Sequence, residues 1–383
     1  MKNSQRIETK IIHSGEPSPR VNGAVVMPVF QSAMFEYAGE TDYNDLKYIR
    51  LNNTPNQSVV AEKLAALENA ESAIVTSSGM AAITTTLLTL LSNGDHLLVQ
   101  PSLYGGTQTF VTRDFQNFGI TYDFIDANQP ETWKNKLTKR TRLIYVETIS
   151  NPLMRVPDLK AVAAFAKENG IVSAIDNTFA SPINFRPIEH GYDLSLHSCT
   201  KYLNGHSDIV AGAVIGKSEL VTKILHRLNH LGGSLDPHAA FLLHRGMKTL
   251  ALRVRYQNQS AFKLAHFLER HPAIERVNYP GLESHPQHAI ARDLFEGFGG
   301  MLSFELKDGA KGAAQFMSRA RIPISAPSLG GPETLMTLPA KTSHAGLSPE
   351  ERKTSGISDG LIRISVGIES TDDLLEDFQQ ALS

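Results

Sequence analysis

The alternation of apolar and polar positions divides the chain near residue 58. Residues 1–58 carry only short apolar pieces, such as Val25-Val26-Met27, between proline, asparagine and glycine. A segment of this kind cannot bury a core of its own, so it predicts an irregular arm that lies across another surface. Residues 58–70 then show helical spacing, with Val59 and Leu64 on one face and charges between them.

Apolar runs of strand length alternate with helical patterns after this helix. The strand-like runs lie at 72–76, 96–100, 120–125, 143–147, 171–175 and 194–198, and the helical patterns lie at 81–91 and 159–168. Strands separated by helices favour a mostly parallel sheet that is covered on both faces and binds ligands at the carboxyl ends of its strands. We therefore expect an α/β fold.

The pattern changes again near Gly246. A long charged helix is expected at 247–271, and strand-like runs follow at 274–277, 300–306 and 361–367. This arrangement is typical of an α+β unit. The expected organisation is an N-terminal arm over residues 1–58, a large domain over 59–245 and a smaller C-terminal α+β domain over 246–383.

The composition points to small-molecule chemistry. The 383 residues are 41% hydrophobic and 20% charged, with a net charge of −2 and no basic block. That balance gives no electrostatic footprint for nucleic acid or an anionic membrane. The expected partner is therefore a small molecule, and the expected compartment is the cytoplasm, because neither a signal-like N-terminus nor a membrane-length apolar run is found.

Metal and disulfide chemistry are not expected. Cys199 is the only cysteine, so no intrachain disulfide and no cysteine-based metal site can form. The fourteen histidines show no spacing typical of metal ligands.

Several polar residues fall at or just beyond the ends of the predicted strands. They are Ser78, Tyr104, Glu147, Asp176 and Lys201. Because ligands bind at the carboxyl ends of parallel strands, these residues are expected to converge on one site.

Lys201 stands between small hydroxyl residues, after a β-like run and before a Gly-His turn. A lysine held in a closed pocket loses its proton more easily and becomes a nucleophile. The alternative for this residue alone is an ordinary solvated lysine.

Ser77-Ser78-Gly79-Met80 lies where a strand passes into a helix. Ser78 can cap the helix, and Gly79 allows close approach of a ligand to the free N–H groups, so the helix end is a candidate anion site or a simple N-cap. No P-loop is present, because Ala211 occupies the glycine position that Gly216-Lys217-Ser218 would require. Tyr104, in a glycine-rich turn, is either a stacking residue for a planar ligand or a turn tyrosine.

Asp176 and Arg363 each place a charge at or within an apolar strand. A buried carboxylate needs a cationic partner, which is either a structural arginine or a protonated ligand nitrogen. A buried guanidinium suits a bidentate carboxylate, from a substrate or from an internal salt bridge.

Six ordered motifs resemble one family. They are Tyr48-x-Arg50, Ser77-Ser78-Gly79-Met80, Tyr104-Gly105-Gly106-Thr107, Asp176-Asn177-Thr178, Ser198-x-Thr200-Lys201-Tyr202 with Gly205-His206-Ser207-Asp208, and Arg363-x-Ser365-x-Gly367-x-Glu369. The chain is similar, from about Thr9 to its C-terminus, to the pyridoxal-phosphate enzymes of cysteine and methionine metabolism. This is the family of cystathionine γ-synthase, cystathionine lyase and methionine γ-lyase on the fold-type I scaffold.

The resemblance implies pyridoxal 5'-phosphate as the cofactor. It implies that Lys201 forms the Schiff base and carries protons, that Tyr104 stacks on the ring and assists proton transfer, and that Asp176 keeps the ring nitrogen protonated. The other implied cofactor-binding residues are Ser78, Gly79, Met80, Asn151, Ser198 and Thr200, with Tyr48 and Arg50 reaching over from a neighbouring subunit. The implied assembly is a homotetramer, as a dimer of active dimers.

The substrate site implied by the resemblance contains Arg363 and Ser328 for the α-carboxylate, with Tyr48, Lys47 and Glu333 at its rim. Departures from the family pattern concern the leaving group. Gly106 stands where typical methionine γ-lyases have cysteine, and Thr109 stands where many cystathionine enzymes have arginine. By hypothesis, Lys47 supplies the positive charge for the substrate's distal carboxylate that this arginine would otherwise provide.

Two further departures affect the pocket rim. Pro332 is unusual beside Glu333, and the order Asn53-Thr54-Pro55 replaces the usual Asn-Pro-Thr. The expected activity is a pyridoxal-phosphate carbon–sulfur lyase of the transsulfuration type, which cleaves cystathionine or a related amino acid by γ- or β-elimination. The alternatives are γ-replacement on an O-acylhomoserine, a methionine γ-lyase, and a catalytically idle binding or regulatory protein on the same fold.

Overall fold

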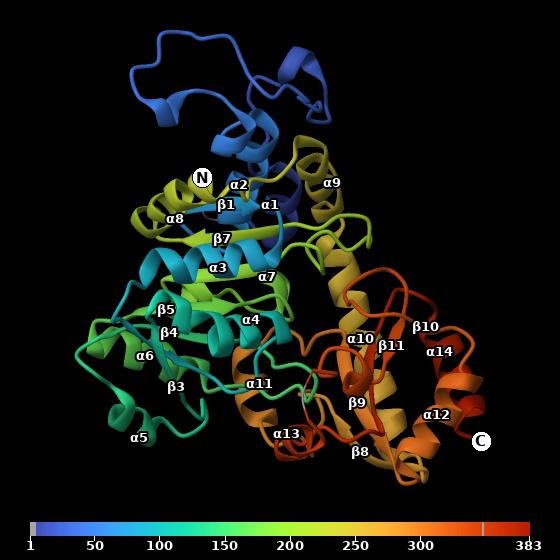
Figure 1. Cartoon of the computed structure of the whole chain (residues 1–383). Coiled ribbons are helices and arrows are strands. Elements are labelled where there is room, and N and C mark those ends of the chain that lie inside the picture. The colour runs from blue at the N-terminus through green and yellow to red at the C-terminus, as the bar shows by residue number, and fades with distance from the viewer. Residues whose placement is uncertain (1–4, 347) are drawn as a thin grey trace.

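A seven-stranded sheet forms the centre of the larger part of the molecule in the computed structural model, which describes residues 5–346 and 348–383 (Figure 1). Its strand order is β1-β7-β6-β5-β4-β2-β3. The bounds are β1 Ser72–Thr76, β2 His96–Val99, β3 Thr121–Phe124, β4 Thr141–Glu147, β5 Val172–Asp176, β6 Leu194–Ser198 and β7 Gly212–Gly216. All six strand-like runs of this region match strands to within two residues.

The sheet is mostly parallel, as predicted, with one reversed strand. β7 pairs antiparallel with both β1 and β6. The other neighbouring strands of the sheet pair in parallel, namely β6 with β5, β5 with β4, β4 with β2, and β2 with β3. The sequence analysis did not identify β7, whose five residues Gly-Ala-Val-Ile-Gly are too short and too glycine-rich to stand out.

Helices cover both faces of this sheet, as expected for parallel strands. One face packs against α3 (Gly79–Leu90) and α8 (Ser218–Leu231), and the other packs against α2 (Pro55–Leu67), α6 (Leu159–Asn169) and α9 (Pro237–Met247). The two apolar cores between helices and sheet leave the carboxyl ends of the parallel strands as the region open to a ligand.

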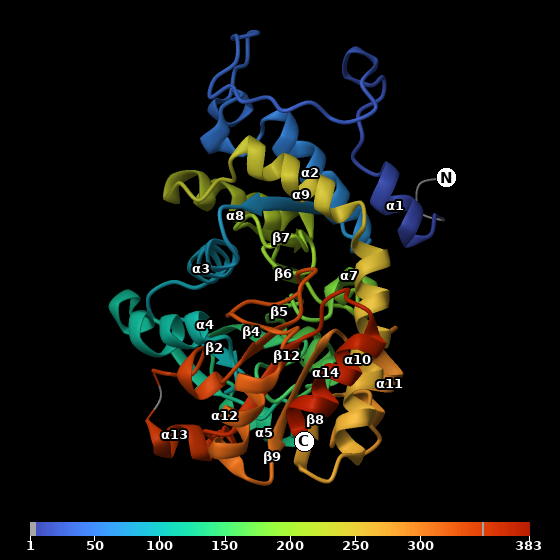
Figure 2. The ribbon, with the colours of Figure 1, turned by 90° about the vertical axis from the view of Figure 1, so that its right-hand side faces the viewer.

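A second sheet of five strands belongs to the C-terminal part of the chain. Its order is β10-β11-β12-β9-β8, from β8 Ile274–Asn278, β9 Met301–Leu306, β10 Ile324–Ser325, β11 Leu335–Thr337 and β12 Leu361–Ser365. It packs against α10 (Leu250–Arg270), α12 (Gly309–Arg319) and α14 (Thr371–Leu382) over a separate core (Figure 2). The boundary at residue 245 stays a prediction.

Short helices complete the fold. They are α4 Gly105–Thr109, α5 Pro130–Trp133, α7 Ser181–Asn184, α11 His288–Leu294 and α13 Pro349–Thr354. Within the described ranges, none of the helices has the length and apolarity needed to cross a bilayer.

The N-terminal arm is more ordered than its sequence predicts. It begins with helix α1 (Ile7–His13), which buries Ile11 and contacts α2 and α10, so the expectation of a wholly irregular arm was wrong for these residues. Two turns of helix are too short to show a period, and tertiary packing stabilises them instead. The remainder is mainly extended chain and short 3-10 turns, and Figure 1 shows it projecting at the top of the molecule, in blue.

Glu16 anchors this arm to the large sheet's helices. Its Oε2 lies 2.9 Å from Arg20, and its Oε1 lies 3.7 Å from Lys63 on α2 and 3.4 Å from Lys248 after α9. His244 also lies 2.8 Å from Oε1. Burial alone would raise the pKa of Glu16, but His244 and the lysines bring it below the ordinary value.

We expect Glu16→Gln to lower the free energy of unfolding by about 2 to 3 kcal/mol, because it leaves the buried Lys63 amine without its anion. Urea unfolding at pH 7 measures this loss, and limited proteolysis should cut the arm faster. The pKa of Glu16 is lowered in the folded chain. The difference in unfolding free energy between the variant and wild type should therefore shrink as the pH falls below the ordinary pKa of a glutamate.

Glu219→Gln is the matched control, because Glu219 forms an exposed pair with Lys223 on α8. It should leave the urea midpoint unchanged. Equal losses in the two variants would contradict the anchoring role of Glu16.

Candidate active site

A cavity of about 630 Å³ opens at the carboxyl ends of β1, β4, β5 and β6 and is closed on its other side by β12 and the loop before β11. It brings together most of the residues singled out from the sequence. They are Ser78, Gly79, Met80, Tyr104, Glu147, Asn151, Asp176, Ser198, Thr200, Lys201, Ser328 and Arg363. Residues that are far apart in the chain meet here because parallel strands end at one edge of their sheet.

Four of the predicted site residues do not line this cavity. Lys47 and Tyr48 are exposed on the arm, and Glu333 is exposed after β10. Arg50 donates to the carbonyl of Asn229 at 2.9 Å and to the hydroxyl of Tyr43. The arm residues were expected to serve a neighbouring subunit, so their distance from this cavity leaves that prediction untested.

Lys201 lies in the turn after β6, with its amine inside the cavity. Its Nζ donates to the Ser328 hydroxyl at 2.8 Å. Burial, and then the charge of Arg363, lowers the pKa of Lys201 to about 8. The amine therefore loses its proton near neutral pH far more readily than a solvated lysine does, and the unprotonated form is the one that attacks a carbonyl.

Arg363 enters the cavity from the middle of β12 and is only 6% exposed. Its guanidinium donates to the Asn151 side chain at 3.1 Å and to the carbonyl of Ser328 at 2.9 Å. No carboxylate of residues 5–346 or 348–383 pairs with it, so the internal salt bridge weighed from the sequence is absent there. A buried cation held by neutral groups is suited to a ligand carboxylate.

The loop that carries Ser328 is strained. Ser328 has a φ of 104°, which non-glycine residues rarely adopt. In this conformation its hydroxyl meets Lys201 and its carbonyl meets Arg363. Strain of this kind persists where surrounding contacts fix it, commonly at functional sites.

Asp176 ends β5 and faces the cavity. One carboxylate oxygen accepts the N–H of Thr178 at 2.9 Å, and no lysine, arginine or histidine of the described chain lies within ion-pair distance. Burial raises the pKa of Asp176, while the Thr178 contacts and the charge of His197 oppose this rise. The arrangement leaves room for a cationic ligand group, such as a protonated ring nitrogen.

The N-terminus of α3 also lies at the cavity, where the helix dipole is positive. Ser78 caps the helix by accepting the N–H of Ala81 at 3.0 Å, as predicted. A Cβ built on Gly79 would lie 2.7 Å from the Cβ of Ser198, so only glycine allows this close approach of helix and loop. Free N–H groups, Ser198 and Thr200 together make a site suited to a phosphate.

Tyr104 is 50% exposed and lies above the cavity. Its N–H donates to the Glu147 carboxyl at 2.5 Å, so the turn that carries the ring is tied to the end of β4. The sequence places Glu147 at a strand end without indicating a role for it. The orienting contact of Thr178 also has no local signal, although this residue belongs to the Asp176-Asn177-Thr178 motif.

The charges of the cavity fit pyridoxal phosphate, the cofactor implied by the resemblance. The lysine, the unpaired aspartate and the anion-binding helix end match the aldehyde, ring nitrogen and phosphate that such a group presents. Metal chemistry has no comparable support, since no cluster of three or more potential ligands is found in the described ranges.

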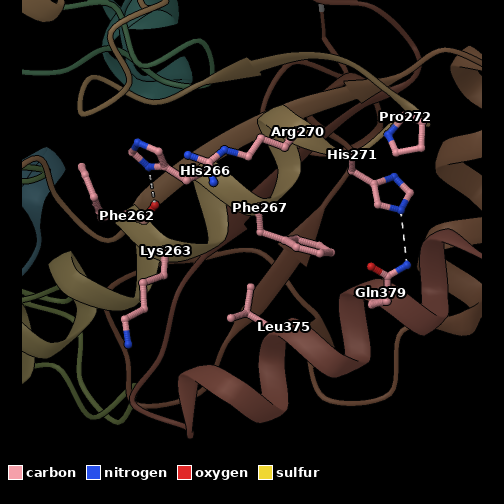
Figure 3. Close-up of a pocket in the computed structure, with 9 residues that line it drawn as sticks. All are labelled: Phe262, Lys263, His266, Phe267, Arg270, His271, Pro272, Leu375 and Gln379. Carbon is pink, nitrogen blue, oxygen red and sulfur yellow. Dashed lines mark hydrogen bonds between the residues drawn. The ribbon is translucent and has the colours of Figure 1, made fainter.

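A second hollow of about 650 Å³ lies between α10 and α14, far in the chain from these residues (Figure 3). Four basic side chains and two phenylalanines dominate its wall, and His271 contacts Gln379 at 3.5 Å. No acidic side chain of the described residues lines this hollow, so its similar volume does not make it a rival active site.

The comparisons with known proteins identify the family. A family model described as Cys/Met metabolism PLP-dependent enzyme matches residues 8–383. The chain is 41% identical to a cystathionine γ-lyase of Dictyostelium discoideum, covering 99% of this chain and 98% of that protein. It is 40% identical to the cystathionine β-lyase MetC of Bacillus subtilis (strain 168), covering 100% and 97%.

A solved structure shows the same fold. The cystathionine γ-synthase of Xanthomonas oryzae pv. oryzae, in complex with aminoacrylate and cysteine, has a TM-score of 0.94 and 38% sequence identity to this chain. The alignment covers 99% of this chain and 98% of that one.

We expect Gly79→Ala to weaken binding of pyridoxal phosphate by about five- to 150-fold, because overpacking of about 1–3 kcal/mol at the helix end displaces its N–H groups. Fluorescence titration of the cofactor-free protein measures the dissociation constant. Ser77→Ala, an exposed change two residues away, is the control and should bind as wild type does. Unchanged affinity in Gly79→Ala would show that α3 does not hold the phosphate.

Proposed function

The chain belongs to the Cys/Met metabolism PLP-dependent enzyme family and is a pyridoxal-phosphate enzyme of the carbon–sulfur lyase class; from that premise we propose that it cleaves cystathionine or a related sulfur amino acid by γ- or β-elimination. The observation that carries the proposal is the cavity that combines Lys201, Asp176 and Arg363. Membership of an enzyme family argues against the idle binding protein considered from the sequence.

Residues on three sides of the cavity would hold the cofactor. Asp176 would face the ring nitrogen, Tyr104 would stack on the ring, and Asn151 would contact the 3-hydroxyl. The phosphate-binding residues in this proposal are Ser78, Gly79, Met80, Ser198 and Thr200, with Tyr48 and Arg50 of a neighbouring subunit. When bound, pyridoxal phosphate supplies an electron sink that stabilises negative charge on the substrate carbons.

Lys201 has two roles in this proposal. Its amine would hold the cofactor covalently through the cofactor's aldehyde carbon, and the same Nζ, once released by a substrate amine, would take the α-proton and return protons to the substrate. A pKa of about 8 suits both directions, because the group can lose and regain a proton near neutral pH. The Ser328 hydroxyl holds the freed amine at the cavity wall.

Arg363 would orient the substrate by its α-carboxylate. Asn151 and the Ser328 carbonyl fix two of its guanidinium nitrogens, and Nε finds no partner among the residues described. A carboxylate here also supplies the missing counterion of a buried cation. The interaction therefore positions the α-carbon near Lys201 rather than merely adding affinity.

A wider groove adjoins the cavity and would receive the leaving group. Tyr104, Thr109, Arg113, Asn151 and Ser343 belong to its wall. Its size accommodates the distal half of cystathionine, which favours this substrate class. The same residues would serve γ-replacement on an O-acylhomoserine, which is the second candidate.

A methionine γ-lyase is a weaker alternative. Gly106 stands where typical members of that group have cysteine, and a Cβ on Gly106 would lie 2.8 Å from the Tyr104 ring and 2.9 Å from the Met80 sulfur. A cysteine here would therefore displace two groups that the proposal assigns to the cofactor.

The arm would complete the site of a neighbouring subunit. It exposes Val25, Met34 and Tyr37, which is unusual for an isolated surface and is consistent with burial in a homodimer or homotetramer. Arg50 lies 5.6 Å from the Tyr48 ring centroid, so the two residues form one unit at the arm's end.

Product analysis tests the proposal. The purified enzyme is incubated separately with cystathionine, methionine, cysteine, and O-acylhomoserine plus cysteine. Pyruvate from cystathionine marks β-elimination, 2-oxobutanoate marks γ-elimination, and new cystathionine marks γ-replacement. Absence of a keto acid from every sulfur amino acid would contradict the lyase proposal.

Lys201→Ala should abolish the yellow absorbance of the lysine-bound cofactor near ~420 nm and lower kcat by at least about 10³-fold, because both covalent binding and proton transfer are lost. Absorbance spectra and keto-acid release measure the two effects. Lys223→Ala, an exposed change on α8, should alter neither. Turnover that survives in Lys201→Ala would refute the assignment of the base.

Lys47→Ala should raise KM for substrates with a second carboxylate more than for monocarboxylic ones, by about threefold or more, if Lys47 supplies a positive charge at the rim. Steady-state kinetics with cystathionine and methionine give the ratio. Lys139→Ala, at the opposite end of β4, is the control. An unchanged ratio would remove Lys47 from substrate recognition.

A further inference from the structure

Two carboxyl groups lie side by side at the bottom of the cavity. Glu147 is the last residue of β4 and Asp176 is the last residue of β5, and the two are register partners on parallel strands. Register partners point to the same face, and neighbouring strands lie only about 4.8 Å apart. Both residues line the cavity, and Glu147 is only 6% exposed.

The surroundings do not support two adjacent negative charges. Tyr145 on β4 and His197 on β6 interact electrostatically with the pair, and Lys201 after β6 and Arg363 on β12 line the same cavity. In the part of the chain that the structure describes, none of these cations comes within ion-pair distance of either carboxyl. Like charges at this separation in a buried site cannot both persist, so one carboxyl holds a proton.

The surroundings favour the negative charge on Asp176. Asp176 accepts the Thr178 N–H at 2.9 Å. Burial raises its pKa, but Thr178, the charge of His197 and the Tyr145 side chain all act to lower it. Glu147 accepts only the Tyr104 N–H among the bonds described. Burial, and then the charge of Asp176, raises the pKa of Glu147 well above its ordinary value.

Glu147 also belongs to a network that holds the Tyr104 turn. Its own N–H donates to the Gln100 side chain at 2.9 Å, and Gln100 donates in turn to the carbonyl of Ser102 at 2.6 Å. The turn between β2 and α4 is therefore attached to the end of β4 at two points, Ser102 and Tyr104.

We propose that Glu147 acts as a neutral carboxylic acid, a positioning residue that fixes the Tyr104 turn while Asp176 alone carries the negative charge facing the cofactor ring. The inference rests on the proposed function for the identity of the ring, but the protonation of Glu147 is a property of this chain. A neutral acid can hold the Tyr104 N–H without competing with Asp176 for the ring nitrogen.

The sign of the pH dependence follows from linkage. A carboxyl whose pKa is raised by folding binds its proton more tightly in the folded state, so stability falls as pH rises from about 4.5 towards the folded pKa. Glu147→Gln keeps the shape and neutral charge without needing this proton. Its Tm relative to wild type should therefore increase with pH.

The test uses the full-length holoenzyme and Glu147→Gln, scanned at one heating rate from pH 5 to pH 8. The Tm difference, variant minus wild type, should grow by at least about 2 °C over this range. A difference that is constant or falls with pH would overturn the proposal. This outcome is independent of which substrate is cleaved, so it is separable from failure of the proposed function.

Two further readouts distinguish positioning from a charged role. Glu147→Gln should keep the absorbance band near ~420 nm, whereas Asp176→Asn should shift or lose it. Glu147→Ala should lower kcat/KM at least about tenfold more than Glu147→Gln, because only glutamine keeps an acceptor for the Tyr104 N–H. Loss of the band in Glu147→Gln would show that Glu147 carries charge and would refute the proposal.

Discussion

Burial of charge without a protein counterion is the constraint on which this site depends. Arg363 is buried and Asp176 is half-buried at the cavity wall, and within the described residues neither forms an ion pair. Such groups cost several kcal/mol unless a ligand completes them. The same burial lowers the pKa of Lys201 to about 8, so one physical effect creates the nucleophile and the binding charges. The protein is thereby suited to a zwitterionic cofactor and an amino-acid substrate.

The parallel sheet is what makes this arrangement possible. Strands β4, β5 and β6 deliver Glu147, Asp176 and Lys201 to one edge, and α3 adds the N–H groups of its first turn. The second sheet contributes Arg363 from β12, held by Asn151 and Ser328. These polar and charged side chains would destabilise an apolar core, but here they meet in the cavity between the two sheets. The arm is attached separately through Glu16 and does not take part in this cavity.

The sequence predicted the strands and the convergence of their end residues because long apolar runs and ordered motifs are local signals. It missed α1 and β7, which depend on tertiary packing, and it could not place Lys47 or Glu333, whose positions depend on loops. The unpaired state of Arg363 and the pairing of Glu147 with Asp176 also had no local signal, since both follow from register and from distant segments. The role of the arm in completing the site of a neighbouring subunit stays a prediction.

The most direct test of the central claim is chemical mapping of the amine that binds the cofactor. The holoenzyme is reduced with borohydride, digested, and analysed by peptide mass spectrometry. The account predicts a stable phosphopyridoxyl group on Lys201, and none after Lys201→Ala. Labelling of a different lysine, or labelling that survives in that variant, would contradict the assignment of this cavity as the active site.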